Sequence, residues 1–242
     1  MDSAEWFATS DWSAMLTLVE KRLPYYKTKR LGQLLSCALM RKLAPHLDKE
    51  LPLVSPLHDV DFYLVVDRMI AFLERHADRL EQDEDAGKIR QDMESVVIRT
   101  LTRRLCDCCS VLAMSGAQEL CYEIRQNHLL RDAEMADAIR DLFGDPFVEH
   151  DKLLPGPGRD PIAYQLASEM YEGRAFDRMA ELGRILEVQG GVDASAIEHC
   201  RRPGEHHRGC WVVDAVLKKR VEPTPPVDRL VEFGVIRPAK GG

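Results

Sequence analysis

Apolar residues recur at spacings of three and four along most of this chain, which is the period of an α-helix. The clearest stripe runs from Phe62 to Leu73, where apolar side chains share one face and charged residues occupy the other. No segment shows the strict alternation of apolar and polar residues that is typical of a half-buried β-strand. The sequence therefore predicts an all-α fold.

Capping residues mark where the predicted helices begin and end. Asp, Thr and a first-turn Pro favour helix starts, whereas Gly and later Pro residues end helices. The predicted starts are Asp11, Thr28, Asp160-Pro161 and Asp193, and the predicted ends are Pro24, Pro45, Gly144, Gly173 and Gly190. Two further helices are expected, one from Trp211 to Leu217 and a long one from Lys88 to about Met114 that breaks near Gly116.

A Pro-Gly repeat suggests how the chain is divided. The segment 155–158 reads Pro-Gly-Pro-Gly, which is a stiff, turn-rich connector. We therefore expect an amino-terminal helical bundle over residues 1–150 and a smaller helical carboxyl-terminal module over residues 159–220. Residues 221–242 are rich in Pro and Gly and are expected to form a loosely attached tail.

Charge and cysteine content exclude several classes of protein. The formal net charge of −7 argues against wholesale coating of nucleic acid or of an anionic membrane. No apolar run is long enough to cross a bilayer, and the amino end lacks the basic and apolar blocks of a signal peptide. Seven cysteines without a secretory signal fit free thiols in a reducing compartment. The expected location is therefore the cytoplasm, with no membrane partner.

The densest group of reactive side chains lies near the carboxyl end. Zinc prefers thiolate and imidazole ligands, and the turn at Pro203-Gly204 allows the chain to fold back on itself. The candidate metal ligands are His199, Cys200, His206 and Cys210. Their spacing matches no established zinc finger, so the alternative is a polar loop with two partly buried thiols and no cofactor.

A second group of cysteines is a weaker candidate for a functional site. Cys106, Cys108 and Cys109 lie in one predicted helix, and Cys121 follows. Cysteine is among the most buried residue types, so these thiols are expected to pack in the core. The sequence also lacks a Gly-x-Ser-x-Gly elbow, a Gly-rich phosphate loop followed by Lys, and a His-Glu-x-x-His motif. We therefore assign no catalytic residue.

The segment 199–220 is basic although the whole chain is acidic. Its six Arg and Lys residues outnumber two acidic ones, which gives this segment a net charge of +4. The candidate binding residues here are Arg201, Arg202 and Arg208, followed by Lys218 to Arg220. Such a surface meets phosphate, an acidic partner or the protein's own acidic bundle, unless it is simply solvated. Trp211 is expected to anchor the core, and Asp214 to pair with Arg208 or another nearby Arg.

The residues at both ends of the chain resemble an uncharacterised protein family that is present in many copies in planctomycete genomes. The carboxyl-terminal motif comprises His199-Cys200-Arg201, Pro203-Gly204, His206 and Arg208-Gly209-Cys210-Trp211-Val212-Val213-Asp214. An upstream part is matched by Arg140 to Phe147, and the family's opening by Glu5-Trp6 with Asp11. The resemblance implies the same division into two helical parts and names no reaction.

One departure from that family bears on the metal. The family's early helix carries several closely spaced cysteines, whereas here Cys37 stands alone beside Leu39 and Met40. This departure argues against a metal site that spans both halves and leaves a site confined to Cys200, His206 and Cys210 unaffected.

Taken as a whole, the sequence favours a non-enzymatic helical protein that binds another protein. Two alternatives stay open. The first is a zinc-binding protein or metal-dependent enzyme centred on the 199–210 segment, and the second is nucleic-acid binding through the basic residues 201–220.

Overall fold

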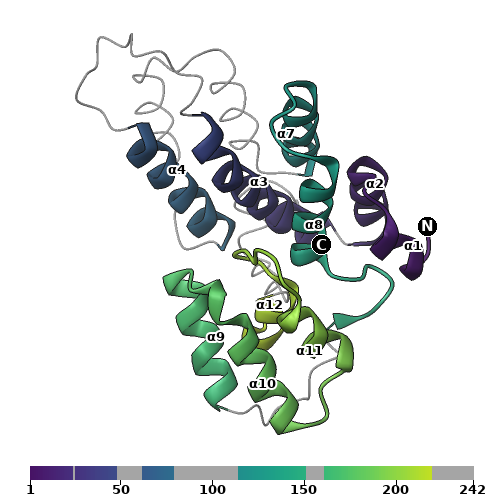
Figure 1. Cartoon of the computed structure of the whole chain (residues 1–242), viewed down its shortest axis with the longest axis vertical. Coiled ribbons are helices and arrows are strands. Elements are labelled where there is room, and N and C mark those ends of the chain that lie inside the picture. The colour runs from purple at the N-terminus through teal and green to yellow at the C-terminus, as the bar shows by residue number, and fades with distance from the viewer. Residues whose placement is uncertain (24, 48–61, 79–113, 151–160, 220–242) are drawn as a thin grey trace, which may run out of the picture.

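The computed structural model describes residues 1–23, 25–47, 62–78, 114–150 and 161–219 (Figure 1). Every regular element in these ranges is a helix, which confirms the all-α fold. The amino-terminal helices are α1 (Ser3–Ala8), α2 (Trp12–Arg22), α3 (Tyr25–Leu47), α4 (Phe62–Ala77), α7 (Met114–Gln126) and α8 (Asp132–Phe143). The carboxyl-terminal helices are α9 (Pro161–Gly173), the 3₁₀ turn η3 (Phe176–Arg178), α10 (Met179–Gln189), α11 (Ala194–Arg201) and α12 (Trp211–Leu217).

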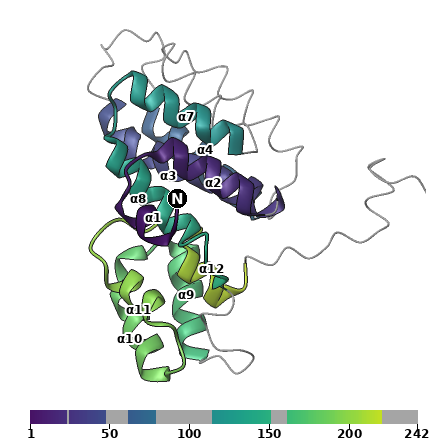
Figure 2. The ribbon, with the colours of Figure 1, turned by 90° about the vertical axis from the view of Figure 1, so that its right-hand side faces the viewer.

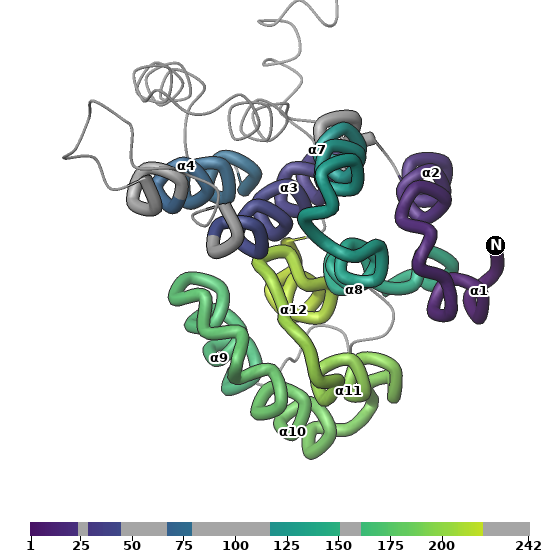
Figure 3. Tube along the Cα trace, turned by 45° about the horizontal axis from the view of Figure 1, so that its top comes forward, coloured from purple at the N-terminus to yellow at the C-terminus, as the bar shows by residue number. Residues whose placement is uncertain are grey.

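The long helix α3 organises the amino-terminal part. It packs against α4, α7 and α8, and α2 completes the group by packing on α8 (Figures 1 and 3). Leu35, Leu39 and Leu43 of α3 are fully buried in one hydrophobic cluster with side chains from the other amino-terminal helices. This cluster fixes α8, whose buried face carries a polar residue of the candidate site.

A second hydrophobic cluster holds the carboxyl-terminal helices together. It joins α9, α10, α11 and α12, and it includes the buried side chains of Tyr171 and Trp211. Figure 2 shows α9, α10 and α11 as a group below the amino-terminal helices. The short helix α12 packs against both α9 and α8, so it connects the two groups.

Several predicted helix ends are confirmed by their capping geometry. The side chain of Asp11 accepts a hydrogen bond of 3.0 Å from the backbone N–H of Ala14 at the start of α2. Asp193 caps α11 in the same way through Ser195. Gly144 ends α8 with φ +63°, where an added Cβ would lie 2.9 Å from Cγ of Trp211. Glycine is therefore required there both for the turn and for the close approach of Trp211.

Three local predictions were wrong, and three others fall mostly or wholly outside the described residues. Helix α3 begins at Tyr25 rather than at Thr28 and continues through Pro45 to Leu47, because tertiary packing of a long helix outweighs one poor residue near its end. Gly116 lies inside α7 and does not break it. Most of the helix predicted from Lys88, the connector 155–158 and the tail 221–242 fall outside the described ranges. No helix in the described part of the chain has the length and apolar character needed to cross a membrane.

Replacement of Gly183 by alanine is expected to destabilise the protein by about 1–2 kcal/mol, because overpacking of a tight contact outweighs the gain in helix propensity. An added Cβ would lie 2.8 Å from Cβ of Cys200, which is part of α11 and has no freedom to rotate away. Urea denaturation measures the change. Gly173→Ala is the matched control, since an added Cβ at Gly173 has no neighbour within 4 Å. Equal stability changes in the two variants would contradict this close packing of α10 on α11.

Candidate metal centre

A buried carboxylate on α8 forms the centre of the candidate site. The side chain of Asp141 is 5% exposed, and its partners come from the carboxyl-terminal part of the chain. Its Oδ1 lies 2.7 Å from Nδ1 of His206 and 3.2 Å from Nε2 of His199. Its Oδ2 accepts a hydrogen bond of 2.8 Å from the backbone N–H of His207 and lies 3.2 Å from Nδ1 of the same residue. Asp141 therefore connects α8 to α11 and to the loop 202–210.

Four side chains converge closely enough to hold one metal ion. The potential ligand atoms of Asp141, His199, His206 and Cys210 all lie within 4.8 Å of one another. Nε2 of His199 is 3.3 Å from Sγ of Cys210. Ligand atoms placed about 2.0–2.3 Å from a tetrahedral zinc ion are about 3.3–3.8 Å apart, so small shifts of these side chains would complete the geometry.

Local structure explains this convergence. His199 lies in the last turn of α11, and Cys210 is the N-cap residue of α12. The loop 202–210 joins these two helices and returns the chain toward α8. Arg208 and Gly209 of this loop are buried, and an added Cβ at Gly209 would clash with Leu34 of α3. The loop is therefore held between the two groups of helices.

Electrostatics in the cluster favour a cation. Burial alone would raise the pKa of Asp141, but hydrogen bonds from His199, His206 and His207 hold this pKa well below its usual value. Its ion-pair partners among the described residues are these histidines, with no Lys or Arg. Burial also lowers the pKa of His199 in spite of the nearby Asp141. The site thus combines a buried negative charge with an imidazole that resists protonation.

The pKa of the Cys210 thiol is also shifted by burial and by the charge of Asp141. Burial, and then the negative charge of Asp141, raise its pKa well above the usual value. The thiol is therefore neutral unless a cation replaces its proton, which is what a zinc ion does on binding to cysteine.

Aromatic rings enclose the cluster. The indole of Trp211 lies 5.2 Å from the ring of His199 and 4.6 Å from the ring of His150, measured between centroids. The rings of His199 and His206 meet edge to face at 5.0 Å. Trp211 is buried and belongs to the second hydrophobic cluster, in the position of a core anchor.

The ligand set differs in one member from the set expected from the sequence. His199, His206 and Cys210 come together, whereas Cys200 lies outside the group. Cys200 faces Gly183 of α10, and burial raises the pKa of its thiol to about 12. Asp141 takes the fourth place. The group thus includes a residue of the amino-terminal half, contrary to the expectation of a site confined to the carboxyl-terminal segment.

A second buried carboxylate receives side chains from the same loop. Asp78 follows α4, and its side chain is 3% exposed. It accepts hydrogen bonds from Arg208 (3.0 Å and 3.1 Å), from Arg30 of α3 (2.8 Å and 3.0 Å) and from the hydroxyl of Tyr171 (2.8 Å). Arg30 also pairs with Asp214 of α12 at 2.5 Å. The arginine partner of Asp214 is therefore supplied by α3 and not by the loop.

Four of the five Arg and Lys residues of the segment 199–219 have partners within the chain. Arg208 and Lys219 pair with Asp78, and Arg201 pairs with Glu187 of α10. The guanidinium group of Arg202 lies over the ring of Phe7. Lys218 is exposed, and Arg220 lies outside the described residues. Most of the cationic charge expected to meet a phosphate backbone is thus directed to acidic or aromatic groups of the protein itself.

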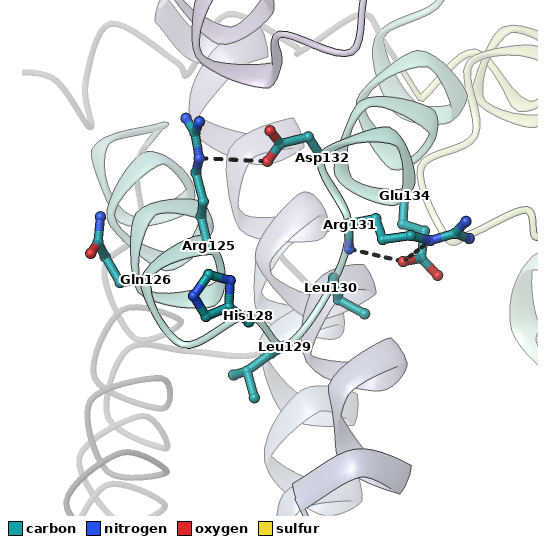
Figure 4. A pocket seen from close by; sticks show the side chains of 8 residues that line it. All are labelled: Arg125, Gln126, His128, Leu129, Leu130, Arg131, Asp132 and Glu134. Atoms are coloured by element: carbon teal, nitrogen blue, oxygen red, sulfur yellow. Dashed lines mark hydrogen bonds and ion pairs between the residues drawn. The ribbon is translucent and has the colours of Figure 1, made fainter.

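Two surface hollows differ in their relation to the cluster. A hollow of about 470 Å³ is lined by Phe7, Val148, His199 and Trp211 among others, so it reaches one of the four candidate ligands, His199, from the surface. Another, of about 560 Å³, lies at the turn between α7 and α8 (Figure 4). Its charged side chains pair with each other, Arg125 with Asp132 and Arg131 with Glu134. The second hollow therefore has the chemistry of a solvated surface.

Of the second cysteine group, Cys121 is buried, as expected for core packing, and burial raises its pKa to about 12. Cys106, Cys108 and Cys109 lie outside the described ranges.

Comparisons with known proteins found no matching family model, no matching curated protein and no matching solved structure. The resemblance to the planctomycete family rests on its motif residues and stays a prediction.

Proposed function

We propose that this chain is a non-enzymatic helical binding protein in which one zinc ion, held by Asp141, His199, His206 and Cys210, fixes the carboxyl-terminal helices to α8. The observation that carries this proposal is the convergence of four potential ligand atoms within 4.8 Å in a buried site. Imidazole, thiolate and carboxylate are the ligands that zinc accepts in proteins.

The number of protein ligands favours a structural ion over a catalytic one. Structural zinc sites use four protein ligands, whereas catalytic sites keep one position open for water or substrate. With Asp141 and Cys210 ionised and both histidines neutral, a divalent zinc site carries no net charge. A neutral site is compatible with burial, because the cation removes the cost of two buried negative charges.

Neighbouring groups supply the outer contacts that metal sites need. Ligating carboxylates are usually hydrogen-bonded by further groups, which orient them toward the metal. His207 provides this support for Asp141 through its backbone N–H and its Nδ1. The hollow lined by Phe7 and His199 offers an entry path for the ion.

Elemental analysis of protein purified without a His tag tests the proposal. We expect about one zinc per chain in the wild type and a loss of most of it in Cys210→Ala, since a thiolate ligand is removed. Cys200→Ala is the matched control: Cys200 is also a buried cysteine of the same segment, but it lies outside the ligand group.

The same two variants decide whether the fourth ligand is Asp141, as the geometry indicates, or Cys200, as the sequence predicts. Retained zinc in Cys200→Ala with loss in Cys210→Ala supports Asp141 as the fourth ligand. Absence of near-stoichiometric metal from the wild type, or equal loss in both variants that remain folded by circular dichroism, contradicts the proposed site.

A further inference from the structure

The hollow that reaches His199 is an apolar depression in the surface. Its volume of about 470 Å³ lies within the range of roughly 300–1,000 Å³ that is typical of ligand pockets, and most of its accessible lining is apolar. Phe7 of α1 and Val148 line it together with Trp211, and their side chains are 45% and 40% exposed. Large apolar side chains that are exposed together around a hollow mark a surface for interaction.

The charged residues that line this hollow are mostly acidic. They are the three carboxylates of Asp145, Asp193 and Glu198 and the single guanidinium group of Arg202. With the histidines left aside, these groups give the lining a net charge of −2. Asp193 and Glu198 are exposed, and neither forms an ion pair with a Lys or Arg in the part of the chain that the structure describes. The negative charge of the hollow is therefore available to a partner.

Contacts within the chain hold the walls of the hollow in place. Next to Phe7, the side chain of Trp6 is fully buried, and its carbonyl oxygen accepts a hydrogen bond of 3.2 Å from Nε of Arg140 on α8. The hydroxyl of Ser3 donates a hydrogen bond to Oδ2 of Asp145, which connects α1 to the segment after α8. A preformed surface loses little conformational freedom on binding, so more of the interaction energy contributes to affinity.

We propose that this hollow binds a basic and apolar segment of a partner protein, with a Lys or Arg side chain of the partner seated in it. The inference deepens the proposed function and rests on it, because it names the chemistry of the partner that this binding protein recognises. Lys and Arg combine an apolar stem with a cationic head. One such side chain can therefore contact Phe7 and Val148 through its stem while its head lies near the carboxylate of Glu198.

The aromatic lining adds to this preference. Cations, and guanidinium groups above all, are attracted to the faces of aromatic rings. The chain shows this contact in the hollow itself, where the guanidinium carbon of Arg202 lies 5.7 Å from the centroid of the Phe7 ring. An acidic segment or a phosphate backbone would instead be repelled by the carboxylates of the rim, since like charges at an interface are unfavourable.

Selection from a display library of random peptides on the purified full-length protein tests the proposal. We expect the recovered peptides to place Lys or Arg next to an aliphatic or aromatic residue. A synthetic copy of the recovered peptide should bind one per chain in a fluorescence titration. Its affinity should fall about 10-fold or more in the double variant Asp193→Asn/Glu198→Gln, which removes two charges from the hollow. Asn is as good a helix N-cap as Asp, so the start of α11 is preserved.

The matched control for charge is the double variant Glu172→Gln/Asp177→Asn. It removes two exposed carboxylates from the same part of the chain, and neither lines the hollow. It should lower the affinity for the peptide less than about 2-fold.

A second variant tests the apolar wall and does not depend on the charges. Phe7→Ala should lower the affinity about 10-fold, since aromatic side chains at the centre of an interface contribute most to binding. Tyr122→Ala is its control, because Tyr122 of α7 is 55% exposed and lies outside the hollow.

Failure of this inference and failure of the metal site have different signatures. Phe7, Asp193 and Glu198 are not among the candidate metal ligands, so their variants should contain as much zinc as the wild type. Absence of zinc together with peptide binding that depends on Phe7 and on the two carboxylates would refute the metal site alone. Recovery of no peptide or of acidic peptides, equal losses in the control variants, or unchanged affinity in both hollow variants would overturn the proposed hollow.

Discussion

Replacement of Asp141 by asparagine is expected to lower the free energy of unfolding by about 3 kcal/mol or more and to abolish the proposed binding of zinc. The asparagine side chain has nearly the same shape, so packing on α8 is preserved. It has no negative charge, however, and its amide NH₂ is a donor where the wild type presents a second acceptor oxygen. At least one of the contacts to His199, His206 and His207 is therefore lost around a side chain that is only 5% exposed.

Asp137→Asn is the matched control for this variant. Asp137 lies on the same helix one turn earlier, its side chain is 74% exposed, and it pairs with the largely buried Arg140. Removal of its charge should change stability by less than about 1 kcal/mol, because Asp137 itself is exposed and Arg140 keeps its hydrogen bonds to the backbone oxygens of Trp6 and Thr9. Chemical denaturation of both variants, with metal content measured on the same samples, gives the comparison. A loss in Asp141→Asn no larger than that in Asp137→Asn would remove Asp141 from the centre of the site.

The helices were predictable because their signals are local. The helical period of residues 62–73, the caps Asp11 and Asp193 and the terminating Gly144 each act within a few residues, and the structure has the helix α4, both caps and the end of α8 at Gly144 as expected. The errors at the ends of α3 arose where packing of a long buried helix overrides the preference of a single Thr or Pro.

The candidate site was only partly predictable, because it depends on contacts between residues that are far apart in the sequence. Histidine and cysteine in the 199–210 segment are recognisable as zinc ligands by type alone. Asp141 is 58 residues away from His199 and lies among the apolar residues of its helix. One local signal could have identified Asp141: it is a carboxylate on the same helix face as the apolar residues Ala138 and Leu142. A carboxylate on a buried face needs a polar partner. Which partner it meets depends on the tertiary contact between α8 and the loop 202–210.

The partners of the basic residues in the segment 199–220 could not be predicted from the sequence either. Its charges suggested a cationic surface because a sequence pattern cannot reveal that Arg208 pairs with Asp78, which is 130 residues away. For Arg208, this pairing makes an internal connection of a charge that the sequence assigned to a binding surface. Asp141 and Asp78 thus perform parallel tasks: each is a buried carboxylate of the amino-terminal half that receives neighbouring residues of one loop.

Replacement of Asp78 by asparagine is expected to have the other large effect, a loss of about 3–5 kcal/mol, because removal of one member of a buried ion pair leaves its partners uncompensated. The guanidinium groups of Arg30 and Arg208 are largely buried, and both bond directly to this carboxylate. Arg30 keeps the carboxylate of Asp214, whereas Arg208 keeps the contact with Tyr171 and has no other carboxylate partner among the described residues. The loop 202–210 should consequently loosen, which increased proteolysis at its exposed residues 202–205 would reveal.

The effect of this variant should depend on pH. Burial alone would raise the pKa of Asp78, but Arg30, Lys219 and the hydroxyl of Tyr171 more than offset burial and hold this pKa below its ordinary value of 3.8. A carboxylate with a lowered pKa in the folded state stabilises the protein fully above its unfolded-state pKa. That stabilisation is lost as the pH falls from about 4 through the lower folded-state pKa.

The difference in unfolding free energy between the wild type and Asp78→Asn should therefore be constant from pH 7 to about pH 5 and become smaller below about pH 4. Asp67→Asn is the matched control, since Asp67 pairs with Arg41 at the surface and its side chain is 57% exposed. Its effect should stay below about 1 kcal/mol at every pH. Urea denaturation at pH 7, 5 and 3 provides the data. A difference for Asp78→Asn that is the same at pH 3 as at pH 7 would mean that its carboxylate contributes through shape alone, and that its charge does not hold the loop 202–210 to the amino-terminal helices.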